Sequence, residues 1–235
     1  MVAFRGVRTC EKNMMMKTIL DQLTEAGLWF RDLAQRFSLR RDMAPIATVA
    51  RVEEFAATRS ALITQKKLYG YLKERMGVNY PKVFTDEVFT QSIDLAKLEI
   101  YAASLADLTC FCVANAMTDP LVQNQDRDAV ARACYRHGLA FNADEASDEQ
   151  RARWTDAFDM RLGKTVWSLR GEGGQHFIES PGALVRWAPI AEELKRLDRE
   201  IVENSIRYAW IEVRTDYMAR IRPDAVAADW RMRAG

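Results

Sequence analysis

Asp107 is the residue in this sequence best suited by type and position to a chemical role, because its carboxylate lies among apolar residues in the segment 83–119. An ionisable group in an apolar helix either pairs with a buried arginine or serves, with altered acidity, at a functional site. Because burying a lone charge is costly, we expect Asp107 to pair with an arginine from a neighbouring helix. The alternative is an enzyme with an inter-helix pocket near Asp107.

Two glycine-containing stretches match phosphate-binding loops only in part. Gly163-Lys164-Thr165 has the required ending, but the first glycine of that motif would fall at Phe158. The segment 170–176 is rich in glycine, yet no strand precedes it, as a dinucleotide-binding loop requires. We therefore expect neither stretch to bind a nucleotide, and we interpret 170–176 as a connecting loop.

Cysteine and histidine are too scattered to indicate a metal centre or a nucleophile. Neither His137 nor His176 has a glutamate three residues before it, which is the pattern of a di-iron site in a helical bundle. The four cysteines have no zinc-ligand spacing, and no Gly-x-Ser-x-Gly motif is present. We predict no catalytic residue, no cofactor and no metal. The sequence therefore favours a non-enzymatic function.

Helical periodicity predicts the elements that would position these residues. The segment 83–119 has apolar residues at three- and four-residue intervals and no Gly or Pro before Pro120, so it is the expected central helix. We expect Thr85 to cap it. Long helices are also expected over 46–76 and from Pro189 to Arg222. The predicted fold is all-α: a bundle of about six helices, three of them long, without a β-sheet.

Finer expectations follow from the same pattern. Ser147 and Gln150 are spaced as a capping box that opens a helix reaching roughly to Leu169, and Ser180 is the expected cap of the next helix. The residues expected to face the core in helix 46–76 are Phe55, Leu62, Tyr69 and Met76. Those expected to do so in the last long helix are Ile190, Leu194, Leu197, Ile201, Ser205, Ala209 and Val213.

The chain is expected to form a single helical domain over 17–222, with the glycine-rich loop at 170–176. Residues 1–16 lack periodicity and are expected to be a loosely attached tail. Residues 223–235 are expected to be a C-terminal tail that adds at most a short turn of helix through Trp230.

The overall charge is close to zero, with 34 basic and 33 acidic residues. This balance argues against a protein that coats nucleic acid or anionic lipid throughout. The four cysteines show no disulfide framework and no secretory signal is recognisable, so we expect reduced thiols and a cytoplasmic location.

Two local surfaces could still bind a charged partner. Helix 17–41 carries apolar residues beside arginines, which suits a membrane surface or a partner protein. Its candidate residues are Trp29, Phe30, Phe37, Arg36, Arg40 and Arg41. Helix 46–76 carries the densest basic patch, which is a solvated face or, alternatively, a site for an anion or nucleic acid. Its candidate residues are Arg59, Lys66, Lys67 and Lys73.

The leading functional hypothesis is a non-catalytic helical protein that acts through protein–protein interaction, as an adaptor, scaffold or accessory subunit. Long amphipathic helices and abundant Trp, Tyr and Arg favour it, since these residues are enriched at interface hot spots. A protein partner or an oligomer formed by self-association is therefore expected. A membrane surface is the alternative partner, and nucleic acid is the least expected.

Overall fold

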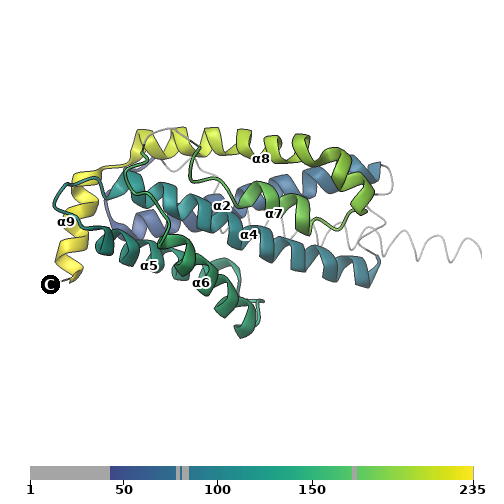
Figure 1. Ribbon diagram of the computed structural model, residues 1–235, viewed down its shortest axis with the longest axis horizontal. Coiled ribbons are helices and arrows are strands. Elements are labelled where there is room, and N and C mark those ends of the chain that lie inside the picture. Colours follow the sequence, from purple (N-terminus) through teal and green to yellow (C-terminus); the bar gives the residue numbers. More distant parts are fainter. Residues whose placement is uncertain (1–42, 78–79, 81–84, 171–173, 235) are drawn as a thin grey trace, which may run out of the picture.

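The computed structural model describes residues 43–77, 80, 85–170 and 174–234. Within these residues the chain forms seven α-helices and no β-sheet (Figure 1), which confirms the all-α bundle. The three long helices are α2 (Val49–Met76), α4 (Glu87–Ala116) and α8 (Glu192–Arg220). The others are α5 (Asn124–Asn142), α6 (Asp148–Leu162), α7 (Ser180–Trp187) and α9 (Pro223–Ala234).

Helix α4 is the central element, as expected from its apolar sequence. From Leu98 to Ala116 every residue except Ala103 is buried, because α2, α5, α7 and α9 all pack against α4. Its N-cap is Asp86 and not Thr85, since the Asp86 side chain accepts a hydrogen bond from the backbone N–H of Phe89 at 3.2 Å. Helix α4 therefore supplies one wall to most of the interior.

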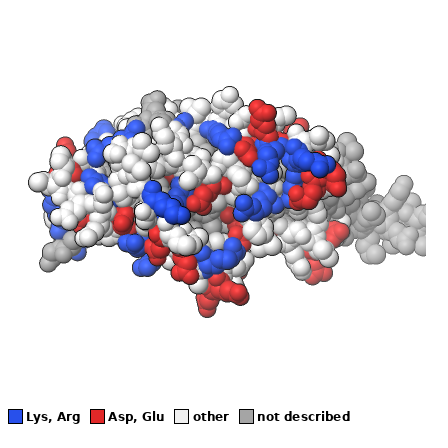
Figure 2. Space-filling model, viewed as in Figure 1, with Lys and Arg blue, Asp and Glu red and all other residues white. Residues whose placement is uncertain are grey.

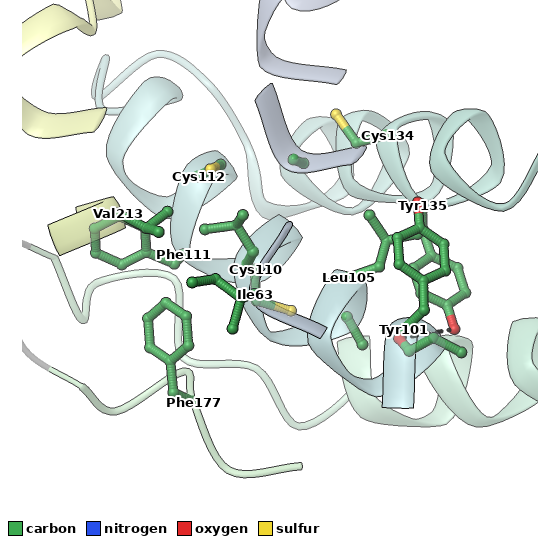
Figure 3. Packing of buried hydrophobic residues seen from close by; sticks show 14 of the residues in the cluster. Ile63, Tyr101, Leu105, Cys110, Phe111, Cys112, Cys134, Tyr135, Phe177 and Val213 are labelled. Atoms are coloured by element: carbon green, nitrogen blue, oxygen red, sulfur yellow. Dashed lines mark hydrogen bonds between the residues drawn. The ribbon is translucent and has the colours of Figure 1, made fainter. Parts of the chain in front are cut away.

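Where α4 crosses α5, the two backbones approach closely. A Cβ added at Gly138 of α5 would lie 2.6 Å from Leu105 Cδ2 of α4, so a larger residue here would force the Leu105 side chain to shift. The Tyr101 hydroxyl of α4 donates a hydrogen bond to the Gly138 carbonyl oxygen at 2.8 Å. Figure 3 shows Tyr101, Leu105 and Tyr135 in this part of the core.

Helix α4 is also the one helix among the described residues that is long and apolar enough to cross a membrane. Almost all of its most apolar window is buried inside the molecule. This burial is typical of a core helix in a soluble fold and fits the expectation that α4 packs inside the bundle.

Helix α2 follows the expected boundaries closely, with Thr48 as its cap and Gly77 at its end in a left-handed conformation (φ 50°). The expected core line is only partly correct: Phe55 is buried, but Leu62 is exposed. A seven-residue step turns the line back by about 20° per heptad on a helix of 3.6 residues per turn. The buried face therefore passes to Leu68 and Leu72 instead.

Helix α6 opens with the expected capping box, in which Ser147 Oγ accepts from the Gln150 N–H at 3.1 Å and the Gln150 side chain accepts in return. It ends at Leu162 and not near Leu169, because Gly163 terminates it. Trp167 then turns inward and donates from Nε1 to Asp128 Oδ1 at 2.9 Å.

The N-cap position of α7 is Glu179, whose side chain makes no capping hydrogen bond, so the expected cap at Ser180 is wrong by one residue. The Ser180 hydroxyl instead accepts a hydrogen bond at 3.0 Å from Nε1 of Trp210, a residue of α8. This bond, together with Phe177 packed against Trp210 at 4.9 Å between ring centroids, joins α7 to α8.

The expected core line of α8 is wrong along its first half, because Leu197 and Ile201 are 75% and 73% exposed. The helix instead buries Val202, Ile206 and Trp210. Trp210 lies about half a turn around the helix from Ile201. The face with the larger aromatic side chains therefore packs on the bundle, and the line through Leu197 and Ile201 points away from it.

The C-terminal residues form more than the short turn that the sequence indicated. Residues 223–234 are helical throughout as α9, and Val226 and Ala227 are fully buried against the bundle. The start of the described chain lies beside the end of α8, where Ile46 and Ile221 form an isolated parallel bridge.

Candidate functional site

Asp107 lies at the centre of a buried polar cluster formed by α4, α6 and the residues leading into α7. Its side chain is fully buried and forms a 2.8 Å ion pair with Arg161 of α6. The expected pairing with an arginine from a neighbouring helix is thus observed. Arg161 is itself only 9% exposed, so each charge is shielded from solvent by the other and by the surrounding helices.

The remaining hydrogen-bonding capacity of Asp107 is taken up by backbone. Its two oxygens accept from the N–H groups of Ile178 at 3.3 Å, Glu179 at 3.2 Å and Ser180 at 2.8 Å. These N–H groups lie at the positive amino end of α7, where a carboxylate is favourable. Asp107 therefore holds the start of α7 against α4 and has no free oxygen with which to take a proton from a substrate.

Arg161 completes the same cluster. It donates to the His176 carbonyl oxygen at 2.6 Å and lies 3.1 Å from a carboxylate oxygen of Glu179. Burial alone would lower the pKa of Arg161, but Asp107, Cys110 and Glu179 together outweigh it and raise the pKa above its ordinary value. The guanidinium is a permanent positive charge that connects three segments of the chain.

The imidazole of His176 is buried next to this cluster. Its Nε2 lies 2.9 Å from the Leu169 carbonyl oxygen, and because a carbonyl can only accept, Nε2 carries the hydrogen. Burial lowers the pKa of His176, and the positive charge of Arg161 acts in the same direction. The ring is therefore neutral near pH 7 and serves as a hydrogen-bond donor in the loop between α6 and α7.

An open cleft of about 420 Å³ lies between α4, α6 and α7, close to this cluster. Its wall from α4 includes Glu99 and the small residues Ala102 and Ala106, and the lining from α6 includes Trp154. Asp107 does not line the cleft. Glu99, which does, accepts from Trp154 Nε1 at 3.0 Å and pairs with Arg153. The inter-helix pocket thus exists, but its buried carboxylate is already paired.

Glu179 is the carboxylate that connects the cleft to the Asp107 cluster. Burial raises its pKa, and Arg161 partly opposes this effect. Its side chain is still partly exposed, so the ionised form keeps some contact with solvent.

The basic patch expected on α2 is only partly a free surface. Arg59 is paired with Asp216 of α8 at 3.1 Å and lies over the Phe55 ring. Lys66 and Lys73 are exposed, and burial lowers the pKa of the half-buried Lys67, with Lys66 adding to the effect. Figure 2 shows the side of the molecule on which α4 and α7 lie in front of α2, and the acidic and basic groups there are intermixed.

The outer face of α8 carries an apolar stripe, which we call the α8 stripe. It consists of Leu194, Leu197, Ile201, Tyr208 and Ile211, which are 37% to 75% exposed. The spacing of three, four, seven and three residues places all five on one side of the helix. Figure 1 shows α8 along one edge of the molecule, and the exposure of these side chains places the stripe on its solvent side.

The apolar spacing of the α8 stripe is visible in the sequence, but the residues Leu194, Leu197 and Ile201 were expected to face the core. Helix α8 has two apolar lines, one through Leu197 and Ile201 and one through Ile206, Trp210 and Tyr217. The inner line is held by Tyr217, which donates a hydrogen bond to the Cys112 carbonyl oxygen of α4 at 2.9 Å. Because the two lines lie on opposite sides of α8, a helix at the edge of the bundle can bury only one of them.

The remaining sequence candidates either lie outside the described residues or are inert. Trp29, Phe30, Phe37, Arg36, Arg40 and Arg41 all fall within 1–42, which the structure does not describe. Cys110, Cys112 and Cys134 are buried free thiols, and burial raises the pKa of Cys110 to about 11. Among the described residues, no group of three or more His, Cys, Asp or Glu side chains could hold a metal ion.

Comparison with known proteins gives no independent guide to this arrangement. No family model matches the chain, and no similar curated protein or solved structure was found.

Proposed function

We propose that this protein acts without catalysis, by binding another protein chain through the α8 stripe. The partner is a second copy of the chain or a component of a larger complex. The observation that carries the proposal is the continuous exposure of Leu197, Ile201 and Tyr208 on the side of α8 that faces away from the core. Contiguous exposed apolar patches on soluble proteins mark interaction sites, whereas single exposed apolar residues do not.

The energetics of burial support this choice. Complete burial of one large apolar side chain is worth roughly 1.5–3 kcal/mol, so a stripe of this size can drive association once the partner covers it. Tyr208 adds an aromatic side chain with a polar tip, a type that is common at interface hot spots. The helical form of the stripe suits a partner that presents a helix of its own.

The alternatives have less support. An enzyme at the cleft would need a free acid or base, but the two carboxylates that line it, Glu99 and Glu179, are both engaged in ion pairs. An anion site on α2 would have to work without Arg59, which is paired with Asp216. We infer a cytoplasmic location from the buried unpaired thiols, which persist most readily in a reducing compartment.

Photo-crosslinking in cells tests the proposal. Tyr208 is replaced by photoreactive benzoylphenylalanine, which keeps an aromatic ring in the α8 stripe. The same amino acid at Met160, an exposed apolar position on α6, is the matched control. We expect one discrete protein adduct from position 208 and none from position 160.

A second substitution separates a specific contact from proximity. Ile201→Glu in the chain that carries the probe at 208 places a charge in the stripe one helical turn from Leu197 and should abolish the adduct. If the adduct survives this change, or if position 208 gives no adduct at all, the α8 stripe is not the interaction surface.

A further inference from the structure

The α8 stripe has the heptad spacing of a coiled-coil seam. Leu194, Ile201 and Tyr208 recur every seven residues and occupy the a positions. Leu197 and Ile211 occupy d positions of the same heptads. Asn204 occupies the remaining d position. A helix with apolar a and d positions binds along a second helix, and a single polar residue in the seam limits which registers are allowed.

The charges that flank the stripe are arranged so that α8 complements itself. The g positions are Glu193, Glu200, Arg207 and Arg214, two acids followed by two bases. In an antiparallel pair the g positions of one helix face those of the other. Reversal of the sequence then sets each acid opposite a base.

From this pattern we propose that the α8 stripe binds the same stripe of a second copy of this chain, with the two helices antiparallel. In this arrangement Glu200 faces Arg207 of the second copy, and the contact occurs twice because of the two-fold symmetry. In the seam Leu197 packs against Tyr208, and Leu194 against Ile211, of the second copy. The proposal rests on the proposed function and names its partner.

The charges also select one register. A shift of one heptad in either direction would set Arg207 opposite Arg207, or Glu200 opposite Glu200, and like charges disfavour both. A parallel pair would gain only the two symmetric contacts between Arg207 and Glu212, whereas the antiparallel pair has four contacts between opposite charges. The parallel pair would also set Glu193 beside Asp198, a buried acid that is already paired with Arg75. Among the antiparallel registers considered, only the one described above has no like-charged g pair.

The side chains are placed to make these contacts. Arg207 is about half exposed and is held only by Glu203 at 2.9 Å and Asn204 on its own helix, so a change of partner costs little. Arg214 is less available, because its guanidinium lies over the Phe177 ring at 5.5 Å. The Glu200–Arg207 pair should therefore dominate the electrostatic term.

Disulfide trapping on the purified full-length chain tests the orientation. Cys10 is first replaced by serine, and the three buried cysteines remain. Two differently tagged single variants, Leu197→Cys and Tyr208→Cys, are mixed and oxidised. We expect only the mixed disulfide between the two variants. Disulfides joining two chains of the Leu197→Cys variant would indicate a parallel pair and overturn the proposal, as would the absence of any product.

Charge reversal gives a second, independent readout. Glu200→Arg and Arg207→Glu should each weaken self-association about tenfold, measured by sedimentation equilibrium, because each sets like charges opposite one another. The double variant restores opposite charges and should recover most of the affinity. If both single variants associate as tightly as the wild type, the proposed register is wrong.

The outcomes for the partner and for the proposed function can be told apart. The adduct from position 208 is digested and its peptide identified. A peptide that contains Leu197 of a second copy supports self-pairing. A peptide from a different protein, or from residues 17–41 of the same chain, overturns self-pairing. A peptide from a different protein leaves the proposed function intact. The absence of any adduct removes both the proposed function and the self-pairing.

Discussion

The Asp107 cluster and the α8 stripe are opposite cases of the same physical rule. Asp107 is a charge in an apolar interior, and each of its oxygens is met by Arg161 or by backbone N–H groups. Leu197 and Ile201 are apolar groups at the surface, and they are largely exposed to solvent. In the first region the buried charge is paired within the chain, whereas in the second the apolar side chains have no covering group within the chain.

This difference separates structure from function in a protein without a catalytic motif. A fully paired buried charge holds the fold together and has little capacity left for a ligand. An exposed apolar stripe stabilises nothing until a partner covers it. Substitutions in the two regions should therefore have opposite consequences, one for the free energy of unfolding and the other for association.

The largest effect on stability is expected from Asp107→Ala. It leaves the guanidinium of Arg161 buried without its main partner, and alanine offers no acceptor in place of the lost carboxylate. The free energy of unfolding should therefore fall by about 3–5 kcal/mol. Urea denaturation measures this loss, with Asp156→Ala, an exposed carboxylate on α6, as the control. A loss below about 1 kcal/mol would mean that the cluster is not structural.

A smaller effect is expected where α5 meets α4. Gly138→Ala drives a methyl group against Leu105 and should cost about 1–3 kcal/mol of unfolding free energy. Gly70→Ala on α2 meets nothing within 4 Å and should instead stabilise by about 0.5–1 kcal/mol. Equal changes of either sign in the two variants would contradict the close packing of α4 and α5.

The pH dependence of stability should reveal His176. Its pKa is lowered below 6.5 in the folded state, so the unfolded chain takes up the proton first as the pH falls through 6.5. Stability contributed by the neutral ring is therefore lost below about pH 6.5. His176→Gln should flatten this decline in thermal unfolding between pH 7.5 and 5.5. His137→Gln, at an exposed position on α5, should leave the decline unchanged.

The smallest effect on stability is expected in the α8 stripe. Leu197→Glu and Ile201→Glu change exposed residues, so each should alter the unfolding free energy of the separated chain by no more than about 0.5 kcal/mol. Chemical denaturation at high dilution measures this change. A loss of several kcal/mol would show that the stripe packs within the chain and would remove the contrast with Asp107.

Sequence reasoning identified the elements and the problem posed by Asp107, because both depend on local pattern. It could not name Arg161, which is 54 residues away in the chain and reaches Asp107 only through the packing of α6 on α5 and α4. The end of α6 was missed for a similar reason. The helix ends at Leu162, and Trp167 in the segment that follows donates to Asp128, a tertiary contact that periodicity does not reveal.

Helix α8 shows where pattern reasoning reached its limit. Its two apolar lines look alike in sequence, and only the packing of Trp210 and Tyr217 against α7 and α4 decides which one is inside. The membrane or partner face predicted over 17–41 lies outside the described residues and stays a prediction.

The native mass of the complex that contains this chain in its own cells is the most direct test of the α8 stripe as an interaction surface. The wild type is compared with the double variant Leu197→Glu, Ile201→Glu by native electrophoresis and light scattering. We predict that the wild type exceeds the chain mass of 26.9 kDa and that the double variant returns to it, while the unfolding free energies of the two separated chains at high dilution stay alike. The same mass for both proteins would contradict the proposed function.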